Sequence, residues 1–419
     1  MGASRNGSNG LTDAAEVRYA YRQIRAAFGP LTNKEKKAVT LTTEQKNDFL
    51  ARGFSRRSFG RLATLFAAGT SLPFAHEFAF AQVAIDSRKL PPGAVKIDNN
   101  ENPLGPCKEA LDAMSAILPH GGRYMFYLPG ELSEVMASQE GVSQKYVQVH
   151  DGSSAPLLQA VLSYTSPTRP FVIADPGYEA GVEAAKFIGA KVVNVPLTKD
   201  WAHDVHKMAA VENAGLIYVC NPNNPTGTMT RKEDIEWLVA NKPAGCIVMI
   251  DEAYIHFAGK EEHTSMKLVA QDKDVIILRT FSKIYGMAGL RAGVAIGRPD
   301  LIRKTRGFGI NWNPVTSVSG SMAALKAKEV VPQRKQINAD IRDNTIAFLE
   351  KKGFKVIPSV SNKFMVDTRK PTREAISALR KDLIYVGRPW PSMPTWIRVS
   401  VGTKEEMDKF QTAFVKSFA

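Results

Sequence analysis

Seven short and almost uninterrupted apolar runs constrain the fold of this chain more than any other feature. They lie at residues 146–149, 171–174, 191–195, 216–220, 247–250, 275–278 and 293–296. Strands that are apolar on both faces are typical of a mostly parallel sheet with helices on both sides. Amphipathic stretches predict helices between the runs at 155–163, 181–188 and 231–240, the last with a capping box formed by Thr230 and Glu233.

The pattern changes beyond residue 320, which indicates a second domain. A long helical stretch at 321–349 is followed by shorter strand candidates at 355–358, 363–366 and 396–400. We therefore predict an α/β fold in which a large domain, built on a mostly parallel sheet of seven strands, is joined to a smaller α+β domain. The predicted boundaries are 1–81 for an N-terminal extension with a signal peptide, 82–125 for an arm that joins the small domain in part, 126–320 for the large domain and 321–419 for the C-terminal small domain.

The net charge of +14 arises from 55 Lys and Arg against 41 Asp and Glu. The body of the chain has no cluster of basic residues interleaved with aromatic ones, so we expect no nucleic-acid partner. The cysteines Cys107, Cys220 and Cys246 form no disulfide framework, and the histidines show no metal-ligand spacing. We therefore expect no metal site, and the basic character is compatible with an anionic substrate.

A lysine motif follows the sixth apolar run. Thr280-Phe281-Ser282-Lys283 ends that strand candidate, and Arg291 lies eight residues further on. Open α/β sheets bind ligands at the carboxyl ends of their strands, which is where this lysine is placed. Its amine can form an imine with an aldehyde while Arg291 holds that aldehyde's phosphate. A solvated loop is the ordinary alternative for such a Ser-Lys pair.

Three further motifs suit a pyridine ring. Asp251, at the end of a buried strand, can pair with a protonated ring nitrogen and keep the ring an electron sink. Tyr254 and Asn224 can contact a phenolic oxygen, and Tyr178, after another strand, can stack on the ring. Taken singly, these motifs have ordinary explanations, namely a helix cap for Asp251 and turns for Asn224 and Tyr178.

Anion-binding residues complete the set. Ser153 and Ser154 follow Gly152 at a predicted helix start, where backbone N–H groups and the helix dipole attract anions, although serine is also a good helix cap. Arg398 lies within an apolar strand candidate, where a charge requires a partner. That partner is either a substrate carboxylate, held in a bidentate contact, or a carboxylate of the protein itself.

With these motifs in place, the chain resembles the fold-type I pyridoxal-phosphate aminotransferases of class I and II, and most of all their histidinol-phosphate aminotransferase branch. The resemblance covers about residues 95–415 and is carried by Asn100-Glu101-Asn102-Pro103-Leu104-Gly105, Asn221 to Gly227, Asp251-Glu252-Ala253-Tyr254, Thr280 to Gly293 and Ile397 to Thr403. It implies an aspartate aminotransferase-like fold and pyridoxal 5'-phosphate as the cofactor.

The resemblance also assigns roles. Lys283 would form the imine with the cofactor and move the proton, Asp251 would hold the ring nitrogen, Asn224 and Tyr254 the phenolic oxygen, and Tyr178 would stack on the ring. The phosphate ligands would be Ser153, Ser154, Ser282 and Arg291, and the substrate-binding residues Arg398, Asn102 and Arg388. Tyr124 would reach the cofactor phosphate of a neighbouring subunit, which implies a homodimer with shared active sites.

Some positions depart from the family pattern. Ser154 and Ala155 stand where the family usually has Asp-Glu, and Met125 and Phe126 follow Tyr124 where Pro-Asp or a similar pair is usual. An upstream tyrosine that contacts histidinol phosphate in the family has no counterpart around 83–97. We therefore expect the cofactor chemistry to be kept and the substrate to be changed.

The N-terminal segment has the pattern of an export signal. Ser55-Arg56-Arg57-Ser58-Phe59 precedes a mildly apolar stretch at 62–74 and the cleavage-site pattern Ala79-Phe80-Ala81. The paired arginines resemble a twin-arginine signal, which predicts the twin-arginine export machinery as a partner and a periplasmic or secreted protein. The apolar stretch is too short for stable membrane insertion. An amphipathic helix with an incidental Arg-Arg pair is the alternative, since 54 residues precede the motif.

The predicted function is a pyridoxal-phosphate-dependent aminotransferase that moves an amino group between an amino acid or amine and a 2-oxo acid acceptor. A lyase, oxidase, racemase or decarboxylase on the same fold is the second candidate, because a fold does not fix its chemistry. A non-catalytic binding protein is the third. Product analysis separates the first two, and trapping of the cofactor on Lys283 tests the third.

Overall fold

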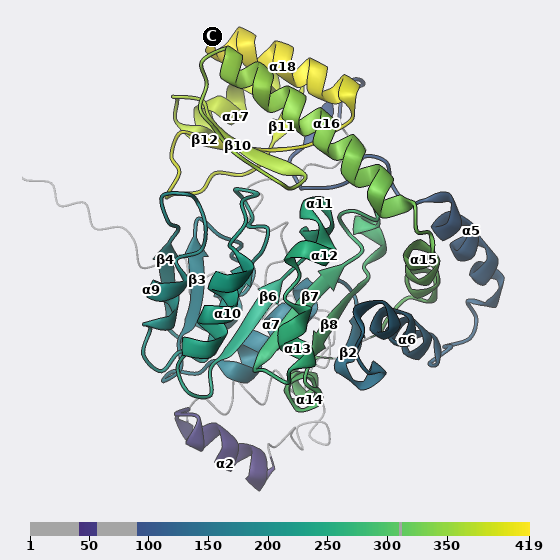
Figure 1. Ribbon diagram of the computed structural model, residues 1–419, viewed down its shortest axis with the longest axis vertical. Coiled ribbons are helices and arrows are strands. Elements are labelled where there is room, and N and C mark those ends of the chain that lie inside the picture. Colours follow the sequence, from purple (N-terminus) through teal and green to yellow (C-terminus); the bar gives the residue numbers. More distant parts are fainter. Residues whose placement is uncertain (1–41, 57–89, 310–311) are drawn as a thin grey trace, which may run out of the picture.

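A seven-stranded sheet forms the centre of the computed structural model, which describes residues 42–56, 90–309 and 312–419 (Figure 1). Its spatial order is β2-β8-β7-β6-β5-β3-β4. The strands are β2 (Val147–His150), β3 (Phe171–Asp175), β4 (Val192–Pro196), β5 (Leu216–Cys220), β6 (Ile247–Asp251), β7 (Val275–Thr280) and β8 (Gly293–Gly297). All seven apolar runs form strands, and the predicted large domain with a mostly parallel sheet is confirmed.

One strand of the sheet is antiparallel to its neighbours. β8 pairs antiparallel with both β7 and β2, whereas the pairs among β3 to β7 are parallel. The connection from β7 to β8 holds only the short η5 (Ala288–Leu290), and a parallel return needs a crossover of a dozen or more residues, usually a helix. Because β8 reverses direction, it begins at the same edge of the sheet where β2 and β7 end.

Helices cover both faces of this sheet. In Figure 1, α10 and α13 lie on the near face and α7 on the far face. The helices of the large domain are α6 (Leu128–Glu140), η4 (Gln144–Tyr146), α7 (Ser154–Tyr164), α8 (Val182–Phe187), α9 (Val205–Ala209), α10 (Lys232–Asn241), α11 (Ile255–Ala258), α12 (Lys260–His263), α13 (Met266–Ala270), α14 (Pro299–Thr305) and η6 (Arg306–Phe308). The predicted capping box of Thr230 is wrong: Arg231 is the N-cap residue of α10, and the Thr230 hydroxyl lies 2.8 Å from the His203 ring Nδ1.

A smaller domain packs at the carboxyl edge of the large sheet. It contains the antiparallel order β12-β10-β9 and the parallel pair β1-β11. Its elements are β1 (Val95–Ile97), α16 (Val330–Lys351), β9 (Val356–Ile357), β10 (Lys363–Asp367), α17 (Thr372–Lys381), β11 (Ile384–Val386), β12 (Trp396–Ser400) and α18 (Lys404–Phe418). Phe364, Phe410 and Phe414 are central to its own hydrophobic core.

The helical stretch predicted at 321–349 is two helices rather than one. α15 (Val315–Lys326) ends before α16 begins, and Pro332 lies in the first turn of α16. Proline has no N–H to donate and is tolerated only in a first turn, so it prevents one continuous helix. α15 packs against α5 (Lys108–Ile117), which η3 (Leu118–His120) follows, so the described part of the predicted arm contributes β1 to the small domain and α5 to the other side of the molecule.

A short N-terminal piece also belongs to the large domain. Helix α2 (Thr43–Ala51) and the turn after it bury Phe49 and Phe54, and Arg52 donates to the Leu162 carbonyl at 2.8 Å. The predicted signal peptide from Arg57 onward lies outside the described residues. No helix in the described ranges is long and apolar enough to cross a bilayer, and no cluster of three metal-ligating side chains occurs there.

A buried ion cluster fixes the strand ends next to the site. The Arg279 guanidinium contacts Glu252 at 2.6 Å and Glu140 at 3.2 Å and donates to the Thr264 hydroxyl at 2.9 Å. Lys260 completes the cluster by contacting Glu140 at 2.8 Å. Glu252 directly follows Asp251, so this cluster fixes the backbone of the predicted ring-nitrogen ligand.

Replacing Arg279 with methionine should strongly destabilise the protein, because it leaves Glu140 and Glu252 buried without their main cation. We expect a loss of about 3–5 kcal/mol in the free energy of unfolding, measured by urea denaturation. Arg298→Met is the matched control, because the Arg298 side chain is 31% exposed where it pairs with Asp274 and Asp300. This control should lose about 1 kcal/mol or less, and equal losses in both variants would contradict the prediction.

Candidate active site

The motifs predicted from the sequence meet at one edge of the large sheet. Asp251 lies in register with Cys220 on β5 and Leu278 on β7, and Gly293, the first residue of β8, lies opposite both Thr280 and His150. A cavity of about 480 Å³ opens at this edge. It is lined by Asn99, Glu101, Asp151, Ser153, Ser154, Ala155, Tyr178, Cys220, Asn224, Asp251, Ala253, Tyr254, Thr280, Ser282, Lys283, Ala288, Gly289 and Arg291.

Lys283 is buried in the wall of this cavity. Its Nζ lies 3.4 Å from the carbonyl oxygen of Asn99 and 5.6 Å from the centre of the Tyr254 ring. The side chain is only 8% exposed, so bulk water reaches its amine poorly. A nucleophilic amine held in this way is directed at whatever occupies the cavity.

Asp251 is a buried carboxyl group with two hydrogen-bond donors. The Tyr218 hydroxyl donates to Oδ2 at 2.8 Å, and the Ala253 N–H donates to Oδ1 at 3.0 Å. Burial raises the pKa of Asp251 to about 6, against the lowering effects of these hydrogen bonds and of the Lys283 charge. The group is therefore largely ionised at neutral pH and suited to a cationic partner such as a protonated ring nitrogen.

Two glycines allow an anion-binding cradle to form. Gly152 has a φ of +106°, and a Cβ at this position would lie 2.4 Å from Nη2 of Arg291. A Cβ at Gly293 would lie 2.9 Å from the backbone nitrogen of Ser153. The first turn of α7 therefore approaches Arg291 closely, and Arg291 Nη1 lies 3.5 Å from the Ser282 hydroxyl.

The α7 end of this cradle is open to an anion. Ser153 is the N-cap residue and makes no side-chain capping hydrogen bond, and the Ser154 hydroxyl lies 3.5 Å from the Tyr178 hydroxyl. Free N–H groups, the helix dipole, serine hydroxyls and a guanidinium thus converge on one place. That combination suits a phosphate group.

Asn224 and Tyr254 lie on either side of Asn100, a residue that the sequence reasoning passed over. The Asn100 Nδ2 donates to the Tyr254 hydroxyl at 3.0 Å and lies 3.3 Å from Asn224 Oδ1. Asn100 is fully buried with a φ of +54°, a conformation that asparagine tolerates better than most residues. The sequence signal for Asn100 was its place in the string Asn99-Asn100-Glu101-Asn102, in which Asn102 was predicted to bind the substrate.

Arg398 approaches the cavity from the small domain but is not one of the residues that line it. Its Nη1 donates to Asn224 Oδ1 at 2.9 Å, and its Nη2 donates to the carbonyl of Asp98. The guanidinium is buried, and its Nε has no hydrogen-bond partner among the residues that the structure describes. These contacts are with an amide oxygen and a backbone carbonyl, so they do not include a carboxylate of the protein, which was one of the two partners expected for Arg398.

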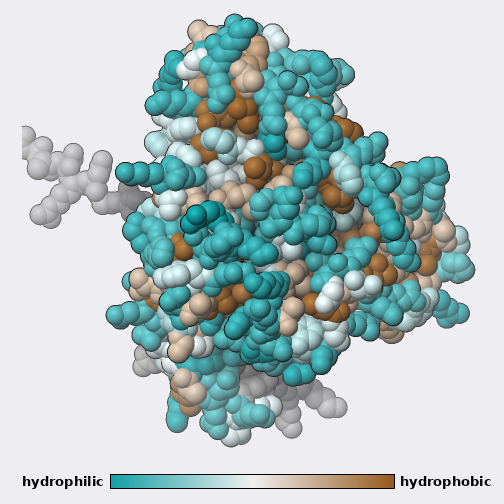
Figure 2. All heavy atoms as spheres, viewed as in Figure 1, coloured by the Kyte–Doolittle hydropathy of each residue, from teal (hydrophilic) through white to brown (hydrophobic). Residues whose placement is uncertain are grey.

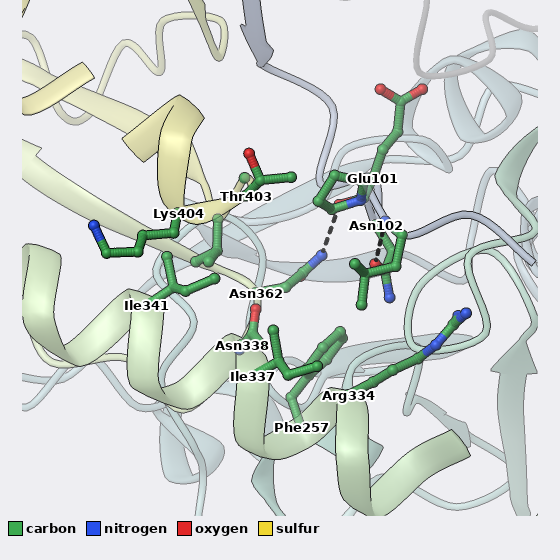
Figure 3. A pocket seen from close by; sticks show the side chains of 14 residues that line it. Glu101, Asn102, Phe257, Arg334, Ile337, Asn338, Ile341, Asn362, Thr403 and Lys404 are labelled. Atoms are coloured by element: carbon green, nitrogen blue, oxygen red, sulfur yellow. Dashed lines mark hydrogen bonds between the residues drawn. The ribbon is translucent and has the colours of Figure 1, made fainter. Parts of the chain in front are cut away.

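Three further predicted residues do not line the cavity either. Asn102 donates to the Ile284 carbonyl at 3.0 Å and lines a separate cavity of about 250 Å³ beside α16, as Figure 3 shows. Arg388 pairs with Glu179 at 2.6 Å. Tyr124 is 74% exposed and makes its ring contacts with Phe126 and Trp312. Their roles as substrate or cofactor residues stay predictions.

Tyr218 is a second contributor that the sequence reasoning missed. It lies in the middle of β5 and is buried, and burial raises its pKa well above 10. A buried tyrosine usually finds a hydrogen-bond partner. Tyr218 needs such a partner and lies two residues before the end of β5, and these two facts together could have pointed to Asp251.

These features fit pyridoxal 5'-phosphate group by group. A primary amine faces the cavity for the aldehyde, a buried carboxylate suits the ring nitrogen, and Tyr254 suits the phenolic oxygen. The cradle at Gly152, whose shape depends on the absence of a Cβ, suits the phosphate. The donor set therefore matches the functional groups of the cofactor one by one.

Comparison with known proteins leads to the same family. Residues 93–414 match the aminotransferase class I and II family model. The chain is 33% identical over 326 residues to the histidinol-phosphate aminotransferase of Moorella thermoacetica, covering 75% of this chain and 83% of the relative. It is 30% identical over 322 residues to the aromatic amino acid aminotransferase of Cutibacterium acnes, covering 75% and 90%.

A solved structure shares both fold and cofactor. The histidinol-phosphate aminotransferase of Sinorhizobium meliloti, in complex with pyridoxal 5'-phosphate, superposes with a TM-score of 0.73 at 26% identity and covers 83% of this chain and 95% of its own. Aspartate aminotransferase of Thermus thermophilus gives a TM-score of 0.72 at 20% identity, which shows the fold. This chain therefore belongs to the class I and II aminotransferases and is a pyridoxal-phosphate-dependent enzyme that transfers an amino group to a 2-oxo acid.

Proposed function

We propose that this aminotransferase takes an aromatic L-amino acid as its amino donor and binds the donor's α-carboxylate at Arg398. The observation that carries the proposal is the buried Arg398 guanidinium beside Asn224. The Nε of Arg398 makes no hydrogen bond within the described ranges. The Trp390 ring centre lies 5.2 Å from this guanidinium, so a buried aromatic ring packs beside the proposed carboxylate site. The aromatic amino acid aminotransferase among the relatives supports the choice.

The side chains divide the work as follows. The bound cofactor supplies an electron sink for the electrons left at the donor Cα when its proton leaves. Lys283 removes and returns that proton, which its burial beside the cavity favours. Asp251 would keep the ring nitrogen protonated, and Tyr254 and Asn224 would hold the phenolic oxygen. Arg291, Ser282 and the first turn of α7 hold the phosphate and fix the ring in place.

A second donor is histidinol phosphate. It is favoured by the match to the Moorella thermoacetica relative at 33% identity. Histidinol phosphate carries a phosphate and no carboxylate, so Arg398 would then contact a different anion. The departures at Ser154 and Met125 and the predicted export favour the carboxylate donor over this one.

A panel of donors on the cofactor-loaded enzyme should distinguish the two. We expect phenylalanine, tyrosine and tryptophan to bleach the cofactor's visible absorption, and 2-phenylethylamine, which lacks the carboxylate, to react at least about 10²-fold more slowly. Lys283→Ala should lower turnover by about 10³-fold or more while the protein stays folded. Efficient reaction of histidinol phosphate with no reaction of the amino acids would contradict the carboxylate-donor proposal.

We also propose that the enzyme is a homodimer with shared active sites. Tyr124, Phe126, Tyr127 and Trp312 are each at least 60% exposed, and the Tyr124 and Phe126 rings stack 5.2 Å apart. Apolar residues also reach the surface on the side of α5, α6 and α15 (Figure 2), including Leu111 and Leu118. Exposed aromatic clusters of this kind mark interaction surfaces, and a second copy of this chain is the occupant that places Tyr124 at a phosphate.

Mixed dimers should test this arrangement. Tyr124→Phe alone should weaken cofactor binding about 10-fold, because it removes one hydrogen bond to a charged group. In a heterodimer of a Lys283→Ala chain with a Tyr124→Phe chain, the only site with Lys283 receives an intact Tyr124 from its partner. Wild-type cofactor affinity at that site is expected. A weakened site in the heterodimer would show that Tyr124 acts within its own chain.

Finally, we propose that the enzyme is exported by the twin-arginine route after it has bound its cofactor, because that route carries folded proteins. N-terminal sequencing of the periplasmic or secreted protein should find Gln82 as the first residue. Arg56→Lys combined with Arg57→Lys should keep the chain in the cytoplasm. Retention of an intact N-terminus in the cytoplasm of the unaltered strain would contradict the proposal.

A further inference from the structure

Lys363 is a fully buried lysine that none of the proposed roles includes. It is the first residue of β10 in the small domain and lies in register with Ser400 of β12. Burial of an ammonium group costs much free energy unless compensating contacts are made. Its Nζ donates to the Ser361 hydroxyl at 2.9 Å and lies 3.1 Å from the centre of the Tyr254 ring, well within cation–π range.

This contact links Lys363 to the proposed cofactor ligands. The Tyr254 hydroxyl accepts a hydrogen bond from Asn100, which also lies next to Asn224. The cavity is lined by Tyr254 and not by Lys363, so the lysine lies behind the tyrosine as seen from the cavity. It therefore acts on the site through the ring that separates it from the cofactor position.

Other charges surround the same region and set the background. Lys283, Arg291, Glu101 and Asp151 lie on the cavity wall. Asp251 ends β6, and Arg398 approaches from β12. Burial raises the pKa of Asp251, and the charges of Lys283 and Lys363 both lower it. The positive charge of Lys363, in the small domain, thus affects Asp251 on the cavity wall.

We infer that Lys363 is a positioning residue whose fixed positive charge, transmitted by Tyr254, stabilises negative charge on the cofactor's phenolic oxygen and disfavours a proton on the Lys283 nitrogen. A nearby cation favours an anion and opposes the charged form of another cation. The inference rests on the proposed roles of Tyr254 and Lys283 and is independent of the amino donor. Through Tyr254, a charge of the small domain would then influence the chemistry at the large sheet.

The test is a pH titration of the visible absorption of the cofactor-loaded enzyme without any amino donor. Lys363→Met keeps the length of the side chain and removes its charge. We expect the midpoint of the titration to rise by about one pH unit, a tenfold change in proton affinity. Ser361→Ala is the matched control, because it removes the hydrogen bond to the ammonium and keeps the charge, so its midpoint should stay close to that of the unaltered enzyme.

A double variant tests the route through Tyr254. In a Tyr254→Phe background, which removes the hydroxyl and keeps the ring, the effect of Lys363→Met should shrink to less than half. A shift of full size in that background would overturn the inference, as would an unchanged midpoint in Lys363→Met. Lys363→Gln, neutral but polar, gives the same readout if the methionine variant does not retain the cofactor. A titration with the expected shift but no turnover with any donor would reject the proposed donor and leave Lys363's role supported.

Discussion

The close approach of two backbones, near Gly152 and Gly293, is the constraint on which the site depends. The antiparallel β8 brings its first residue between the ends of β2 and β7, and any side chain at Gly293 would collide with the start of α7. A side chain at Gly152 would likewise displace the Arg291 guanidinium. With both glycines, a helix N-terminus, Ser282 and Arg291 reach the same point. The position of a phosphate fixed there determines where the ring of the cofactor lies relative to Lys283.

Asn100 has a corresponding role between the two domains. Its backbone carbonyl accepts one hydrogen bond from the Asn362 side chain, and its side chain contacts Ser400, Tyr254 and Asn224. Asn362 and Ser400 belong to the small domain, whereas Asn224 and Tyr254 follow strands of the large sheet. The positions of Arg398 and Lys363 relative to the large sheet are therefore set in part by this one buried amide, and a shift of the small domain would be felt directly at the proposed phenolic-oxygen ligands.

The sequence was most informative where the physics is local. Apolar runs predicted all seven strands of the large sheet, because all of them except the edge strand β4 are buried on both faces and show no polar alternation. The ends of these strands located the cavity. It was less informative where a side chain has two possible partners. Thr230 has the spacing of a helix cap, yet its hydroxyl contacts His203 across the fold. Asn100 and Asn102 are equivalent candidates in the sequence, and only the fold, which buries Asn100 with a positive φ, separates them. Lys363 likewise looks like any lysine at a strand start until the fold places the Tyr254 ring beside it.

The balance of buried charge explains why these features belong together. Lys283, Lys363 and Arg398 bring buried positive charges to the region where Asp251 brings a buried negative one, and Arg291 adds another cation at the rim of the cavity. Such an excess is costly in a protein interior unless anions complete it. The phosphate and phenolic oxygen of the cofactor and the anionic group of the substrate are suitable anions. Binding of these anions offsets the free-energy cost of burying the cations. It therefore favours the site with its ligands bound over the empty site.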